Sequence, residues 1–240
     1  MSAAKIPSLR VRDLHACYGR AQVLFGVNLD VDAGEVVALM GRNGAGKSTT
    51  LKSIMGLLPG VKGSVTFGER NMSGLDAFQI ARAGIGYVPE DRRIFSELSV
   101  LENLEVGRQP PREGTPHWTF ERLAKLFPNL AEMRHRPGAR MSGGEQQMLT
   151  VARTLMGNPY LVMLDEPSEG IAPRIVEDLA NMIVALKQEG LSVLLCEQNL
   201  HFAQLVCDRA YIIEKGQVRY EGTMRALAQD DAVKREYLSV

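Results

Sequence analysis

The chain has 240 residues, 45% of them hydrophobic and 23% charged, which is enough for one large domain or two modest ones with a sizeable core. Its 28 basic residues balance its 28 acidic residues, so the composition excludes an overall positive charge that would attract nucleic acid or anionic lipid. The sequence has neither the apolar core of a signal peptide nor a run of about 18 apolar residues, so we expect no membrane span and no secretion, and its 3 scattered cysteines favour a reducing, cytoplasmic compartment.

The first part of the chain reads as strands. Two runs, at 9–18 (LRVRDLHACY) and 22–31 (QVLFGVNLDV), leave no room for a helix between them and predict an antiparallel β flap. Further along, we expect a buried strand at 35–40 (EVVALM), then a glycine-rich turn, then a helix that ends near Leu58. Short β-branched runs predict two more strands, at 64–67 and 85–88.

The middle of the chain changes to helical spacing. From Glu90 to Gly157 apolar residues recur at three- and four-residue intervals, which predicts a helical subdomain inserted into a core formed by 1–89 and 158–240. A proline-rich stretch at 109–116 (QPPREGTP) predicts a surface loop. Strand patterns then resume, so the whole chain predicts a single α/β domain with a largely parallel sheet. The remaining expected elements are strands at 160–164, 192–196 and 210–214, a helix from Pro173 to near Gly190, and a short helix in 230–238 (DDAVKREYL).

A glycine-rich motif, GRNGAGKS, lies between a predicted strand and a predicted helix, the context that a phosphate-binding loop requires. Its glycines let backbone N–H groups turn inward and, with the helix N-terminus, bind a polyphosphate. We expect Lys47 to reach the β- and γ-phosphates and the Ser48 hydroxyl to bind Mg²⁺. This motif alone leaves kinases, GTPases, recombinases and transporters as alternatives. The residues expected to contact the nucleotide here are Gly41, Arg42, Asn43, Gly44, Ala45, Gly46, Lys47, Ser48 and Thr49.

Two acidic residues end a second buried run, LVMLDE, at 161–166. Asp165 therefore falls at the carboxyl end of a strand, where ligands of open α/β sheets bind, and we expect it to hold Mg²⁺ directly or through water. We expect Glu166 to polarise the attacking water as the general base. Such a run alone usually indicates only a strand end. Together with the phosphate-binding loop earlier in the chain, it indicates a catalytic and Mg²⁺-binding site.

A second Ser-Gly-Gly cradle, in MSGGEQQML at 141–149, precedes a helical run. Together with the two motifs above, it resembles the signature, Walker A and Walker B set of the ATP-binding cassette family, and the resemblance covers essentially the whole chain. It implies a P-loop NTPase core with a β flap and a helical subdomain, ATP and Mg²⁺ as cofactors, and ATP hydrolysis. It also implies that Ser142, Gly143 and Gly144 bind the γ-phosphate of ATP held by the opposite subunit, so that one chain carries two half-sites.

Further positions carry over from the family one by one. Tyr18, in ACYGR, matches the aromatic residue that stacks on adenine, with a core tyrosine as the alternative. Glu90 stands where the family usually has Gln, and it can still bind Mg²⁺ through oxygen. Gln198 stands where the family usually has His; it can donate a hydrogen bond to the γ-phosphate but cannot carry a proton near neutral pH. His201 is an alternative donor at that position.

The runs VPEDRRIF, MSGGEQQM, DEPSEGIAP and CEQN resemble one of the two ATPase subunits of branched-chain amino-acid importers, and ATPases of urea and short-chain amide importers are nearly as similar. The resemblance implies a second cassette subunit in a homo- or heterodimer, integral-membrane permease subunits, indirectly a periplasmic substrate-binding protein, and no nucleic-acid partner. It places the chain peripherally on the cytoplasmic face of the inner membrane. In the loop that contacts the other subunit, Ala172 departs from the Asp of many members.

The resemblance also places a docking helix of the permease beside the segment Glu90–Leu98 (EDRRIFSEL). We expect Ile94 and Phe95 to form an apolar anchor there, unless Phe95 and Leu98 face the protein's own core. Arg92 and Arg93 are expected at the rim. Two other classes stay open, namely a P-loop kinase or soluble regulatory ATPase, in which the second cradle is only a capped helix, and a non-catalytic nucleotide-binding module, which the intact lysine and strand-end acids disfavour.

Overall fold

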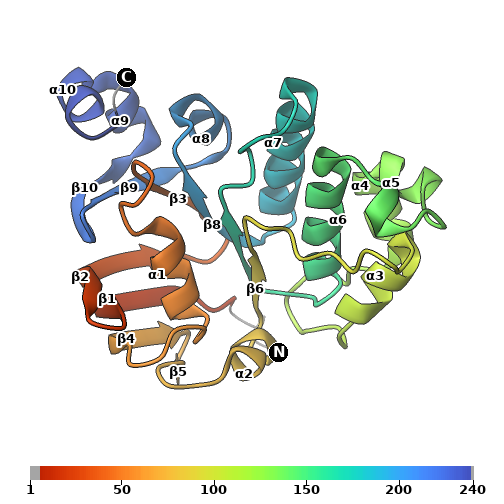
Figure 1. The fold of residues 1–240 in the computed structure, drawn as a ribbon, viewed down its shortest axis with the longest axis horizontal. Helices are drawn as coiled ribbons and strands as arrows, with labels where there is room; N and C mark the ends of the chain where they lie inside the picture. Colours follow the sequence, from red (N-terminus) through yellow and green to blue (C-terminus); the bar gives the residue numbers. More distant parts are fainter. Residues whose placement is uncertain (1–5, 239–240) are drawn as a thin grey trace.

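Two β-sheets pack against each other in the computed structural model, which describes residues 6–238 (Figure 1). The first five and the last two residues of the predicted domain lie outside this range. The smaller sheet has the strand order β2-β1-β4-β5 and is antiparallel throughout, which confirms the predicted flap. Its strands are β1 (Leu9–Tyr18), β2 (Ala21–Val31), β4 (Lys62–Phe67) and β5 (Arg70–Asn71).

The larger sheet has the strand order β10-β9-β3-β8-β7-β6. Its pairs are parallel except for β9 with β10, so the predicted α/β fold with a largely parallel sheet is confirmed. Three of its central strands are buried along their whole length, because both faces of the sheet are covered. The strands are β3 (Val36–Met40), β6 (Ile85–Val88), β7 (Leu161–Asp165), β8 (Ser192–Glu197), β9 (Arg209–Glu214) and β10 (Gln217–Thr223).

β3 divides the interior into two apolar clusters. Val36, Ala38 and Met40 belong to one cluster, and Val37 and Leu39 belong to the other, as the two-residue period of a strand requires. The second cluster fills the space between the sheets and includes apolar residues of α1. The first packs α7 and α8 against the opposite face. The helices of these layers are α1 (Lys47–Ile54), α2 (Ala77–Arg82), α7 (Pro173–Gln188), α8 (Leu200–Val206), α9 (Met224–Gln229) and α10 (Asp231–Val233), followed by a π-helical turn at Lys234–Leu238.

The remaining helices lie together beside α7, at the side of the molecule away from the flap (Figure 1). Their apolar residues, such as Leu104 and Leu149, join the same cluster as Phe202 of α8. The division into a core of 1–89 and 158–240 and a helical subdomain of 90–157 therefore stays a prediction. These helices are α3 (Val100–Gly107), α4 (Phe120–Leu126), α5 (Pro128–Glu132) and α6 (Gly143–Leu155), with a short 3-10 helix at Gly138–Arg140.

One predicted helix boundary is wrong. α1 ends at Ile54 and not near Leu58, because Gly56 adopts φ 64° and the Leu57 N–H closes the helix end on the Lys52 carbonyl at 2.9 Å. The helix expected at 230–238 splits into α10 and the π-helical turn. None of the helices between residues 6 and 238 combines the length and the apolar character that crossing a membrane needs.

Candidate active site

The glycine-rich loop connects β3 to α1 at the carboxyl end of the parallel strands. Gly46 precedes α1 with φ 114°, and a Cβ there would lie 2.9 Å from the Leu24 side chain. A Cβ on Gly41 would lie 2.4 Å from the Ile213 carbonyl oxygen, so the backbone passes too close for any larger residue. The first N–H groups of an α-helix have no acceptor within it and carry partial positive charge. The loop therefore has the shape and the donors that a polyphosphate needs.

Lys47 is almost completely buried at the start of α1. Its ammonium donates hydrogen bonds to the carbonyls of Gly41 at 2.7 Å and Arg42 at 3.1 Å, and it lies 3.0 Å from carboxylate Oε1 of Glu166. Both side chains of this ion pair are shielded from water, with 2% and 7% of their surface exposed. The lysine expected to reach the phosphates is thus held by the loop itself and by the predicted base.

The two residues expected to bind Mg²⁺ through a hydroxyl and a carboxylate lie together. Ser48 Oγ donates a hydrogen bond to Asp165 Oδ1 at 2.8 Å, and Tyr87 donates its phenolic O–H to Oδ2 at 2.9 Å. Burial raises the pKa of Asp165, and these two hydrogen bonds oppose that effect. Oxygen atoms so arranged suit a hard cation such as Mg²⁺. Sequence patterns missed Tyr87, although a polar residue in the otherwise apolar strand IGYV is a signal for it.

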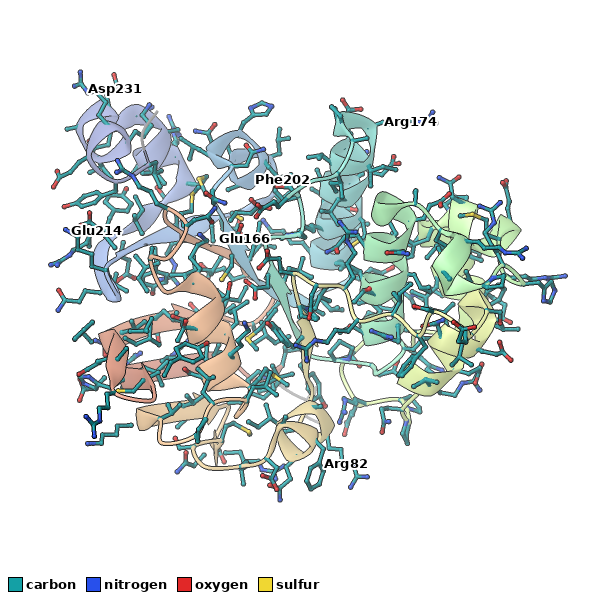
Figure 2. All side chains as sticks on the ribbon, viewed as in Figure 1. Arg82, Glu166, Arg174, Phe202, Glu214 and Asp231 are labelled. Atoms are coloured by element: carbon teal, nitrogen blue, oxygen red, sulfur yellow. The ribbon has the colours of Figure 1, made fainter. Side chains whose placement is uncertain are left out.

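Glu166 lies near the centre of the molecule, directly after β7 (Figure 2). Its φ of 46° is unusual for a non-glycine residue, and its N–H donates to the Cys196 carbonyl at 3.0 Å. Gln198 donates a hydrogen bond from Nε2 to Oε2 of Glu166 at 3.0 Å. Burial acts to raise the pKa of Glu166, but hydrogen bonds with Glu169, Lys47 and Gln198 and the charge of Lys47 together lower it. Glu166 is therefore held ionised, the form that a general base requires.

Glu169, in the loop between β7 and α7, is a second residue that the sequence patterns missed. A hydrogen bond with the Glu166 carboxyl group, followed by burial, raises the pKa of Glu169 to about 7. A turn brings the two together, since the Glu169 N–H donates to the Glu166 carbonyl at 3.2 Å. The signal in the sequence is an acid three residues after the predicted base, but exposed acids are too common for this spacing to stand out.

The side chains of the other predicted site residues make no described hydrogen bond or ion pair with this cluster. Glu90 is exposed beyond β6, and its charge is one of the smaller causes that raise the pKa of Glu169. No described hydrogen bond or ion pair joins Glu90 to Ser48 or Asp165, so its role at Mg²⁺ stays a prediction. Tyr18 ends β1 with 48% of its surface exposed, which contradicts the core alternative. His201 is exposed on α8. In the loop and first turn, Arg42, Asn43 and Gly44 are exposed, whereas Ala45 and Thr49 are buried.

The second cradle lies at the N-terminus of α6, away from the glycine-rich loop. Ser142 caps the helix, accepting a hydrogen bond from the Glu145 N–H at 3.3 Å while its own N–H donates to the Glu145 carboxylate at 2.7 Å. Gly143 adjoins the Arg92 guanidinium, and Gly144 packs on Ile175 of α7. Ser142 is exposed, so capping the helix and facing an anion are compatible. The binding of Ser142 to the γ-phosphate of ATP on another subunit stays a prediction.

A groove of about 630 Å³ opens beside β6 and the end of α3. Four of its lining side chains are large, apolar and exposed, namely Leu57, Phe78, Phe95 and Val106. Phe95 is 47% exposed, which contradicts the alternative that it faces the protein's own core. Ile94 is partly buried, packs against the interior cluster and does not line the groove, so its role as an anchor stays a prediction. Arg93 lines the groove, whereas Arg92 lies against Gly143 instead.

Comparison with known proteins matches the ABC transporter family model to residues 24–169. The high-affinity branched-chain amino acid transport ATP-binding protein BraG of Pseudomonas aeruginosa is 41% identical, over 92% of this chain and 95% of its own length. The lipopolysaccharide export system ATP-binding protein LptB of Escherichia coli K12 is 36% identical, over 96% and 97%. A crystal structure of an ATP-binding cassette of an ABC transporter in its ADP conformation superposes with a TM-score of 0.80 at 27% identity, covering 95% of this chain and 97% of that one.

Proposed function

This chain belongs to the ABC transporter family and is an ATP-hydrolysing subunit, and from that premise we propose that it energises the uptake of branched-chain amino acids through separate permease subunits. One observation carries the substrate class: the 41% identity with an amino-acid transport ATPase over nearly the full length of both chains. The 36% identity with a lipopolysaccharide export ATPase supports a second candidate, export of a lipid-linked glycan. The alternative of a urea or short-chain amide importer gains no support from the site, and family membership removes the P-loop kinase.

The catalytic cluster supports a mechanism in which Lys47 changes partners. Its ammonium would leave the loop carbonyls and Glu166 for the phosphates of ATP held by the loop and the first turn of α1. Ser48 and Asp165 would hold Mg²⁺, which would offset the charge of the β- and γ-phosphates when bound. Tyr87 keeps the Asp165 carboxylate oriented from the neighbouring strand.

Glu166 would then act as the general base on the attacking water. Once Lys47 has moved, Oε1 of Glu166 is available to accept a proton, while Gln198 holds Oε2 and fixes the orientation of the carboxylate. Gln198 itself cannot accept a proton near neutral pH, so the base in this pair is the glutamate. The remaining half-site, at Ser142, would be supplied by a second ATPase subunit, identical or related, on the opposite side of the nucleotide.

The groove beside β6 supports docking to the membrane-embedded partner. Exposed apolar side chains gathered in one hollow indicate an interaction surface. Its charged lining consists of Arg82, Arg93 and Arg153, with no acidic residue among the lining residues of the described chain. A permease segment with an apolar face and acidic residues would complement it. Docking there would place the chain peripherally at the cytoplasmic face of the membrane.

Uptake measured in cells tests this function. Deletion of the gene should abolish the high-affinity uptake of radiolabelled L-leucine, and the wild-type chain should restore it, whereas Glu166→Gln should not. Affinity purification from the same membranes identifies the permease subunits. Unchanged leucine uptake together with a loss of lipopolysaccharide at the cell surface would assign the second candidate instead.

A further inference from the structure

A second pocket, with a volume of about 330 Å³, lies between α4–α5, α6 and α7. We call α6, which begins at the second cradle, the signature helix. Phe127, Leu130 and Met182, all nearly buried, form its apolar floor, and Met148 of α6 adds a flexible wall. This volume lies at the lower end of the range for small-ligand sites, which are typically apolar hollows with a few polar groups. Figure 2 shows Arg174, one of those polar groups, at the end of α7 next to α6.

One wall of this α6–α7 pocket carries both signs of charge. Arg174, Asp178 and Asn181 follow one another at four- and three-residue spacing on α7, so they share a helix face above the apolar floor. Among the described residues, neither Arg174 nor Asp178 takes part in an ion pair. Lys125 lies on the opposite rim.

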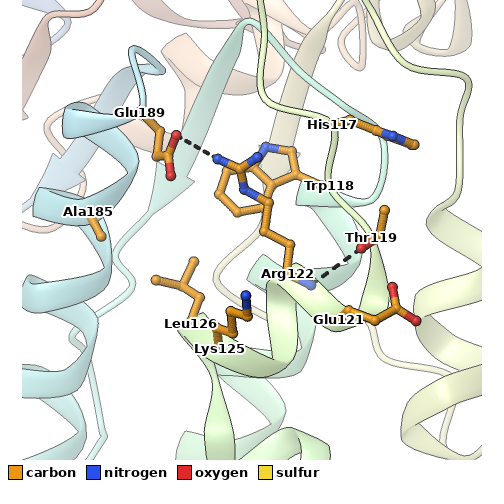
Figure 3. A pocket seen from close by; sticks show the side chains of 9 residues that line it. All are labelled: His117, Trp118, Thr119, Glu121, Arg122, Lys125, Leu126, Ala185 and Glu189. Atoms are coloured by element: carbon orange, nitrogen blue, oxygen red, sulfur yellow. Dashed lines mark hydrogen bonds and ion pairs between the residues drawn. The ribbon is translucent and has the colours of Figure 1, made fainter.

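A neighbouring hollow on the other side of α4 differs in this respect. There the Arg122 guanidinium forms an ion pair with Glu189 at 2.6 Å and lies over the Trp118 ring at 5.1 Å from its centroid (Figure 3). Arg122 is thus matched by the chain's own groups, whereas Lys125, which lines both hollows, forms no ion pair among the described residues. In the α6–α7 pocket a cation and an anion one helical turn apart are left to be matched by a ligand.

We propose that the α6–α7 pocket binds a free amino acid with an apolar side chain. Arg174 would bind the carboxylate, Asp178 the ammonium group, and the floor with Met148 and Met182 the side chain. The need for a zwitterion with an apolar side chain follows from the pocket alone. The choice of a branched-chain amino acid rests on the proposed function, because it is the product that transport would deliver to this side of the membrane.

The pocket adjoins the residues that present Ser142. Glu145 lines it and forms the capping box of α6, and Ile175 lines it and contacts Gly144. A ligand that filled the pocket would contact Glu145 and Ile175, the two residues that adjoin the N-terminus of the signature helix. Bound amino acid would change ATP turnover through this helix end, so that accumulated product regulates the transporter.

Titration calorimetry on the full chain tests the proposal with L-leucine as the probe. We expect a Kd on the order of 1 mM, as befits a ligand of so few atoms. Glycine, 4-methylpentanoate and 3-methylbutylamine, which lack the side chain, the ammonium group and the carboxylate respectively, should each bind at least about 10-fold more weakly, since each loses one pocket contact worth roughly 1.4 kcal/mol. Asp178→Asn and Arg174→Gln, on the surface of α7, should weaken leucine binding at least about 5-fold, and the matched control Glu177→Gln should not.

A second readout is the ATPase rate. L-Leucine should change the rate of the wild-type chain and of Glu177→Gln but not that of Asp178→Asn. The proposal would be overturned if leucine did not bind at concentrations well above the expected Kd, or if 4-methylpentanoate bound as tightly as leucine. It would also be overturned if leucine still changed the ATPase rate of Asp178→Asn. If cells take up leucine normally but the pocket does not bind it, only the pocket proposal fails. If the pocket binds leucine but the cells' uptake does not depend on this chain, only the proposed transport function fails.

Discussion

Substitution of Glu166 by Gln removes one negative charge from a buried cluster while keeping its size. The new amide must point its NH2 group at either the Lys47 ammonium or the Gln198 amide, so one hydrogen bond of the cluster becomes a contact between two donors. Removing one partner of a buried ion pair typically costs about 3–5 kcal/mol. We expect about 1–3 kcal/mol here, because Lys47 keeps its two carbonyl acceptors. For a chain of this size the Tm should fall by about 2–12 °C.

Thermal unfolding and ATP hydrolysis measured on one preparation of Glu166→Gln check both roles of this residue. The phosphates of ATP offer Lys47 a replacement anion, so ATP should raise the Tm of the variant by more than that of the wild type. Turnover should fall by about 10²- to 10⁴-fold, the usual contribution of a positioned base. Glu169→Gln keeps the ion pair and serves as the control at neutral pH. An unchanged Tm without nucleotide would refute the ion-pair reasoning, and near-normal turnover would remove Glu166 from the role of base.

Lys47→Ala should weaken ATP binding by the isolated chain, because it removes a cation that would face the phosphates. Ser142→Arg should leave ATP binding by the isolated chain intact and block ATP-dependent dimerisation. An equal loss of ATP affinity in both variants would refute the proposal that Ser142 binds the nucleotide of the opposite subunit. The pKa of Glu169 is raised from 4.5 to about 7, so between these pH values the folded chain binds more protons than the unfolded chain. The free energy of unfolding should therefore fall as the pH rises from 4.5 to 7. Glu169→Gln should lose that fall in urea titrations across this pH range, and an identical slope in the two proteins would contradict the raised pKa. Arg93→Glu should reduce co-purification with the permease while ATP binding persists, because Arg93 and its partner Asp91 are exposed and their ion pair contributes little to folding. Arg225→Glu, on remote α9, is the matched control, and loss of assembly in both variants would locate the effect outside the groove.

Local patterns predicted the parts of the site that are contiguous in sequence. The glycine-rich loop and the pair Asp165–Glu166 are each defined by neighbours in the chain, and the strand–loop–helix context places them at one edge of the sheet. The strands were found because their sequences are short runs of apolar and β-branched residues. α1 was predicted too long, because its apolar pattern continues past Gly56, where the left-handed backbone ends the helix.

Contacts between distant segments could not be predicted in the same way. Tyr87 reaches Asp165 only because β6 pairs in parallel with β7, a register that no local pattern encodes. Gln198 was expected at the γ-phosphate, and its hydrogen bond to Glu166 depends on β8 ending beside β7. Ile94 and Phe95 are adjacent apolar residues, and only the packing of the loop decides that the first turns inward and the second outward.

The position of β3 between two apolar clusters limits how this chain can change in length. Insertion or deletion of one residue within 36–40 would exchange the two faces of the strand, sending Val37 and Leu39 into the cluster shaped for Val36, Ala38 and Met40. Both clusters would be mispacked at once, and Gly41 would be carried away from the Ile213 carbonyl that it must approach closely. Point substitutions of similar volume are tolerable in such a strand, but its length is not. We therefore expect natural length variation to gather in exposed stretches such as 109–116 and to avoid the few residues before the phosphate loop.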